Sequence, residues 1–243
     1  MARFPLGEGS ALAERSSPSP DAARTSDTET FPAAVSLPVV IGAACWALSI
    51  AFFVNQAIVQ AAFIGPYELA TNVISDLGNT ACGSAICSPL HRLMNVTFIV
   101  VGAFHWLGAI TTLPAWPRRG LGNVGRALLA LAGVGLIVVG AAPENVYGPI
   151  HAYGALVGLV SLNLGMIVLG LAIVRARRWL GLLALGAGIV GFVGLLSFLS
   201  GRLAPGVAER LADYPGAAMI VVFGVVLLAA ALAQRGRAAR VGD

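Results

Sequence analysis

Long apolar runs recur along this sequence, and they restrict the possible folds more than any other feature does. Six of these runs, each of about 20 residues, are long enough to cross the hydrocarbon core of a bilayer as helices. We place them near residues 37–58, 93–113, 126–142, 150–174, 180–200 and 216–233. The sequence therefore predicts an all-α fold, namely a polytopic membrane protein whose six transmembrane helices form a bundle.

The composition fits the same class of protein. Charged residues make up 11% and hydrophobic residues 58% of the 243 residues, whereas a soluble domain carries about 25% charged residues. We expect three parts: a disordered cytoplasmic tail over residues 1–34, a transmembrane domain over 35–234 and a basic cytoplasmic tail over 235–243.

The arginines predict the orientation of the chain in the cytoplasmic (inner) membrane. Nine of them flank one set of helix ends, whereas only Arg92, Arg202 and Arg210 flank the opposite set. Because basic residues gather on the cytoplasmic side, both termini are predicted to be cytoplasmic. Trp116 and Trp179 then fall at the inner boundary, where indole rings are favoured. The net charge of +4 is explained by this topology, so we expect the lipid bilayer as a partner and no nucleic acid.

Between the first two predicted spans, on the outer side, the connector contains an unusual amount of polar chemistry. Its stretch GPYELATNVISDLG has Pro66 at a first helical position and Gly78 where a C-terminal cap belongs. We therefore expect a short amphipathic helix that lies along the membrane surface or over the mouth of the bundle. An ordinary interfacial helix with a solvated polar face would have the same pattern.

Cys82 and Cys87 follow this stretch directly. Outside the cytoplasmic membrane the compartment is oxidising, so a disulfide is the expected state. The loop it closes is so small that the bond contributes only about 2 kcal/mol. Its predicted role is to hold Asp76 and His91 in a fixed relation. The spacing does not match the usual zinc pattern.

The same outer face gathers most of the acids of the chain. Outside the two tails they are Glu68, Asp76, Glu144, Glu209 and Asp213. Two histidines, His91 and His151, lie at the same ends of their predicted helices. Carboxylates, imidazoles and arginines near one mouth can bind an anionic head group, coordinate a metal or transfer protons. They can equally form ordinary ion pairs at helix ends.

Two helix faces add to this cluster. On the fourth predicted span one stripe at helical spacing contains His151, Gly154, Gly158, Ser161 and Gly165. On the second span a similar stripe contains His91, Asn95, Phe98, Gly102 and His105. Small residues let a neighbouring helix approach closely, so both stripes should face the bundle interior. We therefore predict that Asp76, His91 and His151 form one outer-facing site, and that His105 is a hydrogen-bonded core residue.

At family level, the pieces TNVISDLGNTACG, CSPLHRLMN, GPIHAYGA and ERLADYPGAAMIVVFG resemble the actinobacterial branch of the family catalogued as domain of unknown function 998. The resemblance covers nearly the whole chain after the first tail. It implies a six-helix bacterial membrane protein and no particular chemistry. It marks as positions of interest Asn72, Ser75, Asp76, Gly78, His91, Asn95, His151, Glu209 and Arg210.

Three functions remain open, and the sequence specifies no cofactor. The favoured one is the binding or movement of a lipid or small envelope component, with ligand-binding candidates Asn72, Asp76, His91, Asn95, Glu144, His151, Glu209 and Arg210. The alternative is an intramembrane hydrolase with a metal on Asp76, His91 and His151 and with Ser75 nearby, loosely similar to alkaline ceramidases. The remote alternative is a single b-type haem, because His91 and His105 are fourteen residues apart.

Overall fold

The computed structural model describes residues 31–32, 36–83, 86–117 and 119–241, and this part of the chain is helical without a strand. The elements are α2 (Leu37–Leu48), α3 (Ala51–Ala61), the short 3₁₀ helix η1 (Ile74–Gly78), α4 (His91–Thr111), the 3₁₀ turn η2 (Leu113–Ala115), α5 (Arg119–Ala141), α6 (Glu144–Ile173), α7 (Arg178–Leu199) and α8 (Pro205–Val241). Six stretches are long and apolar enough to cross a membrane, with α2 and α3 forming one of them. The predicted all-α, six-span fold is confirmed.

The first span is interrupted at Ser49 and Ile50, between α2 and α3. The Ser49 side chain donates a hydrogen bond to the Cys45 carbonyl, 3.2 Å away, one turn earlier. Such back-bonding competes with the helical ladder and often bends a helix.

Three helices begin well before the apolar runs predict: α5 at Arg119, α6 at Glu144 and α8 at Pro205. α6 begins at Glu144. A carboxylate in the first turn interacts favourably with the positive end of the helix dipole and so stabilises the helix start. α8 begins at Pro205, since proline fits the first helical position well. Two internal prolines, Pro149 and Pro215, made these first turns look like loops. At Tyr147 the backbone leaves helical geometry, shortly before Pro149.

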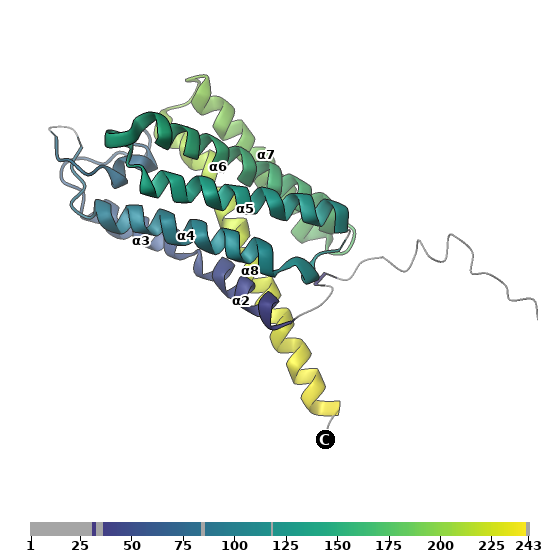
Figure 1. Cartoon of the computed structure of the whole chain (residues 1–243). Helices are drawn as coiled ribbons and strands as arrows, with labels where there is room; N and C mark the ends of the chain where they lie inside the picture. Colours follow the sequence, from purple (N-terminus) through teal and green to yellow (C-terminus); the bar gives the residue numbers. More distant parts are fainter. Residues whose placement is uncertain (1–30, 33–35, 84–85, 118, 242–243) are drawn as a thin grey trace, which may run out of the picture.

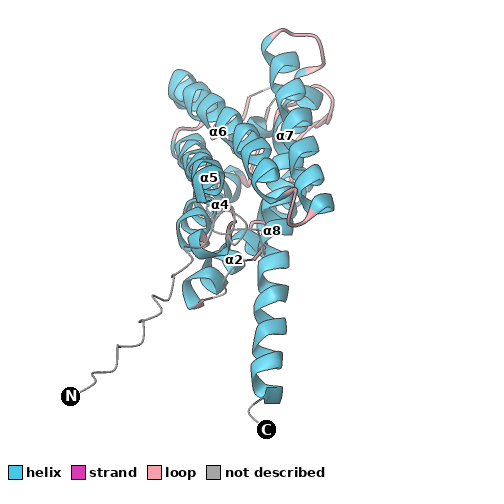
Figure 2. Cartoon of the chain, turned by 90° about the vertical axis from the view of Figure 1, so that its right-hand side faces the viewer, coloured by secondary structure: helices cyan, strands magenta, loops and turns pink. Residues whose placement is uncertain are grey.

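The helices form a closed ring. Each of α4, α5, α6, α7 and α8 packs against the next one in the sequence, and both α4 and α8 pack against α2. Figure 1 shows α4, α5 and α6 side by side, with α8 running behind them from one end of the bundle to beyond the other. In the turned view of Figure 2, the last turns of α8 extend past the rest of the bundle.

The ring has two ends. At one end, here called the loop end, lie residues 62–83, 86–90, 142–143 and 200–204. At the other, the termini end, lie the start of α2, the connections at 112–117 and 174–177, and the end of α8. The predicted tail over 235–243 is helical as far as Val241, because α8 continues to that residue.

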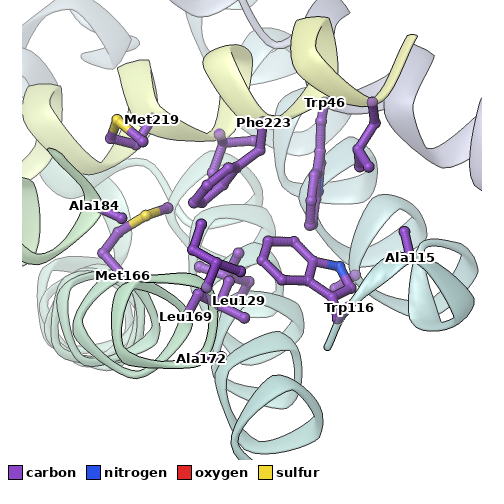
Figure 3. Close-up of a cluster of buried hydrophobic side chains, with 14 of the residues drawn as sticks. Trp46, Ala115, Trp116, Leu129, Met166, Leu169, Ala172, Ala184, Met219 and Phe223 are labelled. Carbon is purple, nitrogen blue, oxygen red and sulfur yellow. The ribbon is translucent and has the colours of Figure 1, made fainter. Parts of the chain in front are cut away.

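Near the termini end, an aromatic cluster forms the larger hydrophobic core (Figure 3). Trp116 stacks edge-on against Phe223, with ring centroids 5.2 Å apart, and is only 4% exposed. Phe31 packs against Trp116 from the segment predicted to be disordered, and Arg177 donates a hydrogen bond to the Phe31 carbonyl. Most of that segment, residues 1–30 and 33–34, lies outside the described part. Trp116 lies in the connection between two spans, as predicted, but its ring is buried in this cluster, whereas Trp179 is 77% exposed.

The small-residue stripe of α6 faces α5. A Cβ atom placed on Gly135 of α5 would lie 2.6 Å from the Gly158 Cα, so the close approach of the two backbones requires glycine at position 135. Gly154 contacts the Val138 side chain in the same interface. This packing turns His151 inward, where it is 6% exposed.

The connector over residues 62–90 differs from the prediction. We expected an amphipathic helix from Pro66 to Gly78, but only η1 is helical, and all of its residues are buried. Within η1 the polar and apolar side chains are therefore both covered, whereas residues 68–71 before it are exposed. The reason is tertiary: the backbone groups of this segment bond to side chains of α4 and α8 in preference to a helical ladder.

Candidate functional site

Two neighbouring residues of α8 hold the connector over the loop end. Arg210 donates hydrogen bonds to the carbonyls of Leu69 (3.0 Å) and Asn72 (2.8 Å). It also donates to the Tyr67 hydroxyl, 2.8 Å away. The guanidinium, a candidate for binding an anionic head group, is thus engaged by the protein's own backbone.

Glu209, the preceding residue, accepts the backbone N–H of Ile74 with one carboxylate oxygen. Its other oxygen lies 3.5 Å from the Ser75 hydroxyl. Together, Glu209 and Arg210 fix the position of η1 relative to α8.

Tyr67 links these contacts to the start of η1. Its hydroxyl donates to the Val73 carbonyl at 2.9 Å while it accepts from Arg210. Burial raises the pKa of Tyr67 to about 12, and the positive charge of Arg210 opposes that rise. Tyr67 therefore stays protonated and able to donate over the physiological pH range.

Ser75 and His151 form a close pair at the centre of the site. The Ser75 Oγ lies 2.8 Å from the His151 Nε2. The other ring nitrogen, Nδ1, lies 2.9 Å from the Ala142 carbonyl oxygen. Both residues are more than nine-tenths buried, so this contact between the connector and α6 is fixed by the surrounding packing.

Asp76 and His91 make local contacts. The Asp76 carboxylate accepts the Val73 N–H at 3.1 Å and the Asn72 amide at 3.0 Å, which caps the turn that begins η1. His91 Nδ1 lies 2.8 Å from the Ser88 carbonyl. In the described part of the chain no hydrogen bond joins Asp76, His91 and His151, so the common site predicted for them is not assembled by direct contacts.

The local contacts of Asp76 and His91 also bear on the metal-dependent hydrolase alternative. Among the described residues, no three side chains of His, Cys, Asp or Glu are arranged to hold a metal ion. The ligand set predicted for the hydrolase, Asp76, His91 and His151, is therefore not formed, because two of its members bond to their own segments.

Further hydrogen bonds tie the connector to α4 and α6. Asn95 donates to the Gly78 carbonyl at 2.9 Å, and a Cβ atom on Gly78 would collide with the Asn95 side chain. Asn145 accepts the Thr80 N–H at 3.1 Å. The predicted disulfide is present, with Cys82 and Cys87 joined.

Two cavities meet at Ser75 and Glu209. The larger, of about 350 Å³, lies between α6, α7 and α8. Most of its walls are apolar, and at one end it is lined by Ser75, Glu144, His151 and Glu209. Two lining residues, Tyr153 and Leu199, are 72% and 63% exposed, so the cavity reaches the outer surface of the bundle.

The smaller cavity, of about 60 Å³, runs from Ser75 and Glu209 past Asp213 to His105. It is large enough for one or two water molecules, each of which occupies about 30 Å³ in the liquid. Nothing else in the described residues bears on the haem alternative, which stays a prediction. The His105 Nε2 is buried without a partner in the described structure, contrary to the predicted hydrogen-bonded core histidine.

Comparison with known families gives one match. The family model described as "Protein of unknown function (DUF998)" matches residues 40–226, from α2 into α8. The chain belongs to the DUF998 family. Neither the curated proteins nor the solved structures include a significant match to it.

The positions that the DUF998 resemblance marked gather at the loop end. All of them lie in the connector or in the turns of α4, α6 and α8 nearest to it: Asn72, Ser75, Asp76, Gly78, His91, Asn95, His151, Glu209 and Arg210. Most serve to position the connector. Ser75, His151 and Glu209 are the members that also line the larger cavity.

Sequence reasoning passed over two residues of the site in this DUF998 chain. Tyr67 was not among the predicted site residues, and Asp213 was noted only as one of the outer acids. Asp213 lies one helical turn after Glu209 on α8, and both line the smaller cavity. Their i,i+4 spacing was a readable signal, but it required the helix to begin at Pro205.

Proposed function

We propose that this DUF998 protein binds a membrane lipid in the cavity between α6, α7 and α8. The observation that carries the proposal is the form of that cavity: apolar walls open to the outside of the bundle, and one end carries two carboxylates, a serine and a histidine. An acyl chain fits the apolar part, and a head group fits the polar end.

The lining chemistry favours a neutral, hydroxyl-bearing head group. Glu144 and Glu209 are hydrogen-bond acceptors when ionised, so they suit the hydroxyls of a glycerol unit. Among the described residues that line the cavity there is no arginine to neutralise a phosphate. Arg210, the nearest candidate, already donates to backbone carbonyls. We therefore assign the ligand to the class of monoacylglycerol-like ester lipids.

We place the head group on the extracytoplasmic side of the cytoplasmic membrane. Arginines gather in the sequence around the termini end, and the positive-inside rule puts that end in the cytoplasm. The Cys82–Cys87 disulfide at the loop end supports the same orientation, because disulfides persist in oxidising compartments.

Native mass spectrometry of the full chain in detergent tests the proposal. We expect mono-oleoylglycerol to bind and lysophosphatidic acid with the same acyl chain to bind at least tenfold more weakly. Ala155→Trp places a large ring in the cavity and should abolish binding of mono-oleoylglycerol. The matched control is Ala229→Trp, at an exposed position of α8 outside both cavities. Equal binding to wild type and Ala155→Trp would refute the proposed site.

A further inference from the structure

The hydrogen bonds of His151 determine where its proton lies. A carbonyl oxygen can only accept, so the contact with Ala142 requires the proton on Nδ1. In the neutral ring Nε2 is then unprotonated, and it accepts the Ser75 hydroxyl 2.8 Å away. A serine hydroxyl that donates to an imidazole held by an acceptor on its far nitrogen has the geometry of an activated nucleophile.

The surroundings keep this geometry fixed on both sides. Ser75 belongs to η1, whose first N–H is held by Glu209, and His151 is held by the α5–α6 packing. The Ser75 hydroxyl has one proton, and the His151 nitrogen is nearer to it than the Glu209 oxygen is, at 2.8 Å against 3.5 Å. The proton is therefore directed to the imidazole.

A carboxyl group shares the cavity wall with the imidazole. Glu144 and His151 both line the larger cavity, two helical turns apart on α6. Such a carboxylate stabilises the imidazolium that forms when a histidine takes up a proton from its nucleophile.

We propose that Ser75 and His151 form an ester hydrolase dyad that acts on the acyl ester of the lipid bound in this cavity. The inference rests on the proposed function for its substrate class. The reactivity of Ser75 follows from the Ser75–His151 pair and does not depend on the proposed lipid-binding function.

In the first step the Ser75 Oγ attacks the ester carbonyl carbon while its proton passes to His151 Nε2. The bond from that carbon to the alkoxy oxygen then breaks, and the leaving oxygen takes the proton from Nε2 to depart as glycerol. In the second step a water molecule gives a proton to Nε2 and attacks the acyl carbon, and Ser75 Oγ leaves with that proton. The sum is ester plus water to fatty acid plus alcohol.

A fluorophosphonate probe tests the dyad without knowledge of the substrate. We expect the purified full chain in detergent to form one covalent adduct, which peptide mass spectrometry maps to Ser75. His151→Gln should slow labelling at least a hundredfold, the lower range for loss of a general base. His91→Gln, at the histidine that bonds to its local carbonyl, should stay within twofold of wild type. Ser200→Ala is the matched serine control, at an exposed position.

An adduct on another serine, no adduct, or equal labelling of wild type and His151→Gln would each overturn the proposal. The mapped adduct of the wild-type chain decides the matter even where Ser75→Ala does not fold. Binding of the non-hydrolysable ether 1-O-octadecylglycerol separates the two proposals. Binding without labelling removes the dyad and leaves the lipid site, whereas labelling without binding removes the lipid assignment and leaves the dyad.

Discussion

Glu209 holds the backbone of Ile74 across a sequence separation of 135 residues, with one carboxylate oxygen accepting the Ile74 N–H. The contact joins the last span to the first connector. It also places Ser75, the next residue, within hydrogen-bond distance of His151. One side chain on α8 thus determines the geometry of a pair of residues on two other segments.

Removal of that acceptor should loosen the connector. We expect Glu209→Ala to lower the free energy of unfolding by about 1–3 kcal/mol, because the Ile74 N–H is left unpaired in a buried position. Glu209→Gln keeps an amide oxygen and should lose less than half of that. Thermal melts of the purified chain in detergent measure both. The control is Glu68→Ala, at an exposed side chain, and a loss there as large as for Glu209→Ala would contradict this explanation.

From the raised pKa of Tyr67 we predict that the stability of the folded chain changes at alkaline pH. Its pKa is raised from 10.0 to about 12 in the folded chain. Between those values the unfolded state loses the proton and the folded state keeps it, so the free energy of unfolding should fall as the pH rises through this window. Below pH 10 the full contribution is present.

Melting temperatures at pH 9 and pH 11 check this linkage. The decrease between the two should be smaller in Tyr67→Phe, which has no phenol to titrate at this position. Identical decreases in the variant and in wild type would show that other groups account for the alkaline loss.

The disulfide should be fully formed and energetically minor. In a Cys45→Ala background, N-ethylmaleimide should add no mass to the native chain and two adducts after reduction, one each on Cys82 and Cys87. Cys82→Ser should cost about 2 kcal/mol, because the loop that the bond closes is short. Helical circular dichroism should not change. Two adducts without reductant would show that the bond is absent from the isolated protein.

The orientation is tested with single cysteines in a background without the native three. Thr80→Cys in the connector and Arg175→Cys after α6 both replace exposed residues at opposite ends of the bundle. In intact cells an impermeant maleimide should label the first and leave the second unlabelled until the cells are lysed. The reverse pattern would invert the topology and, with it, the compartment assigned to the lipid head group.

The number and order of the spans could be predicted because each contains an apolar run that no soluble fold would expose. The residues at which the spans begin and end could not be predicted in the same way. Glu209, Arg210 and Asp213 lower the hydropathy of the first turns of α8, and Pro215 follows them, so this stretch looked like a loop. Its charged groups enter the helix because the connector covers them, a contact that no local pattern encodes.

The candidate residues were also predictable, but not their pairing. Ser75, Asp76 and His151 all stood among the candidates, and sequence reasoning joined His151 to Asp76 and His91 because all three lie near the outer ends of the predicted spans. The 3₁₀ turn rotates Asp76 towards its own backbone and Ser75 towards α6. A change of one residue in register within η1 would exchange their roles, and long-range contacts such as those of Glu209 with Ile74 and of Asn95 with Gly78 fix that register.

The closed ring has a consequence for how the chain is made. At roughly 5–20 residues per second of synthesis, about 7–27 s pass between the translation of Ile74 and that of Glu209. During that interval α2 and the connector lack their partners on α8, whereas Cys82 and Cys87 are already both present. Both cysteines are therefore made before ring closure is possible, and the ribosome delivers the α8 residues that hold the site after them.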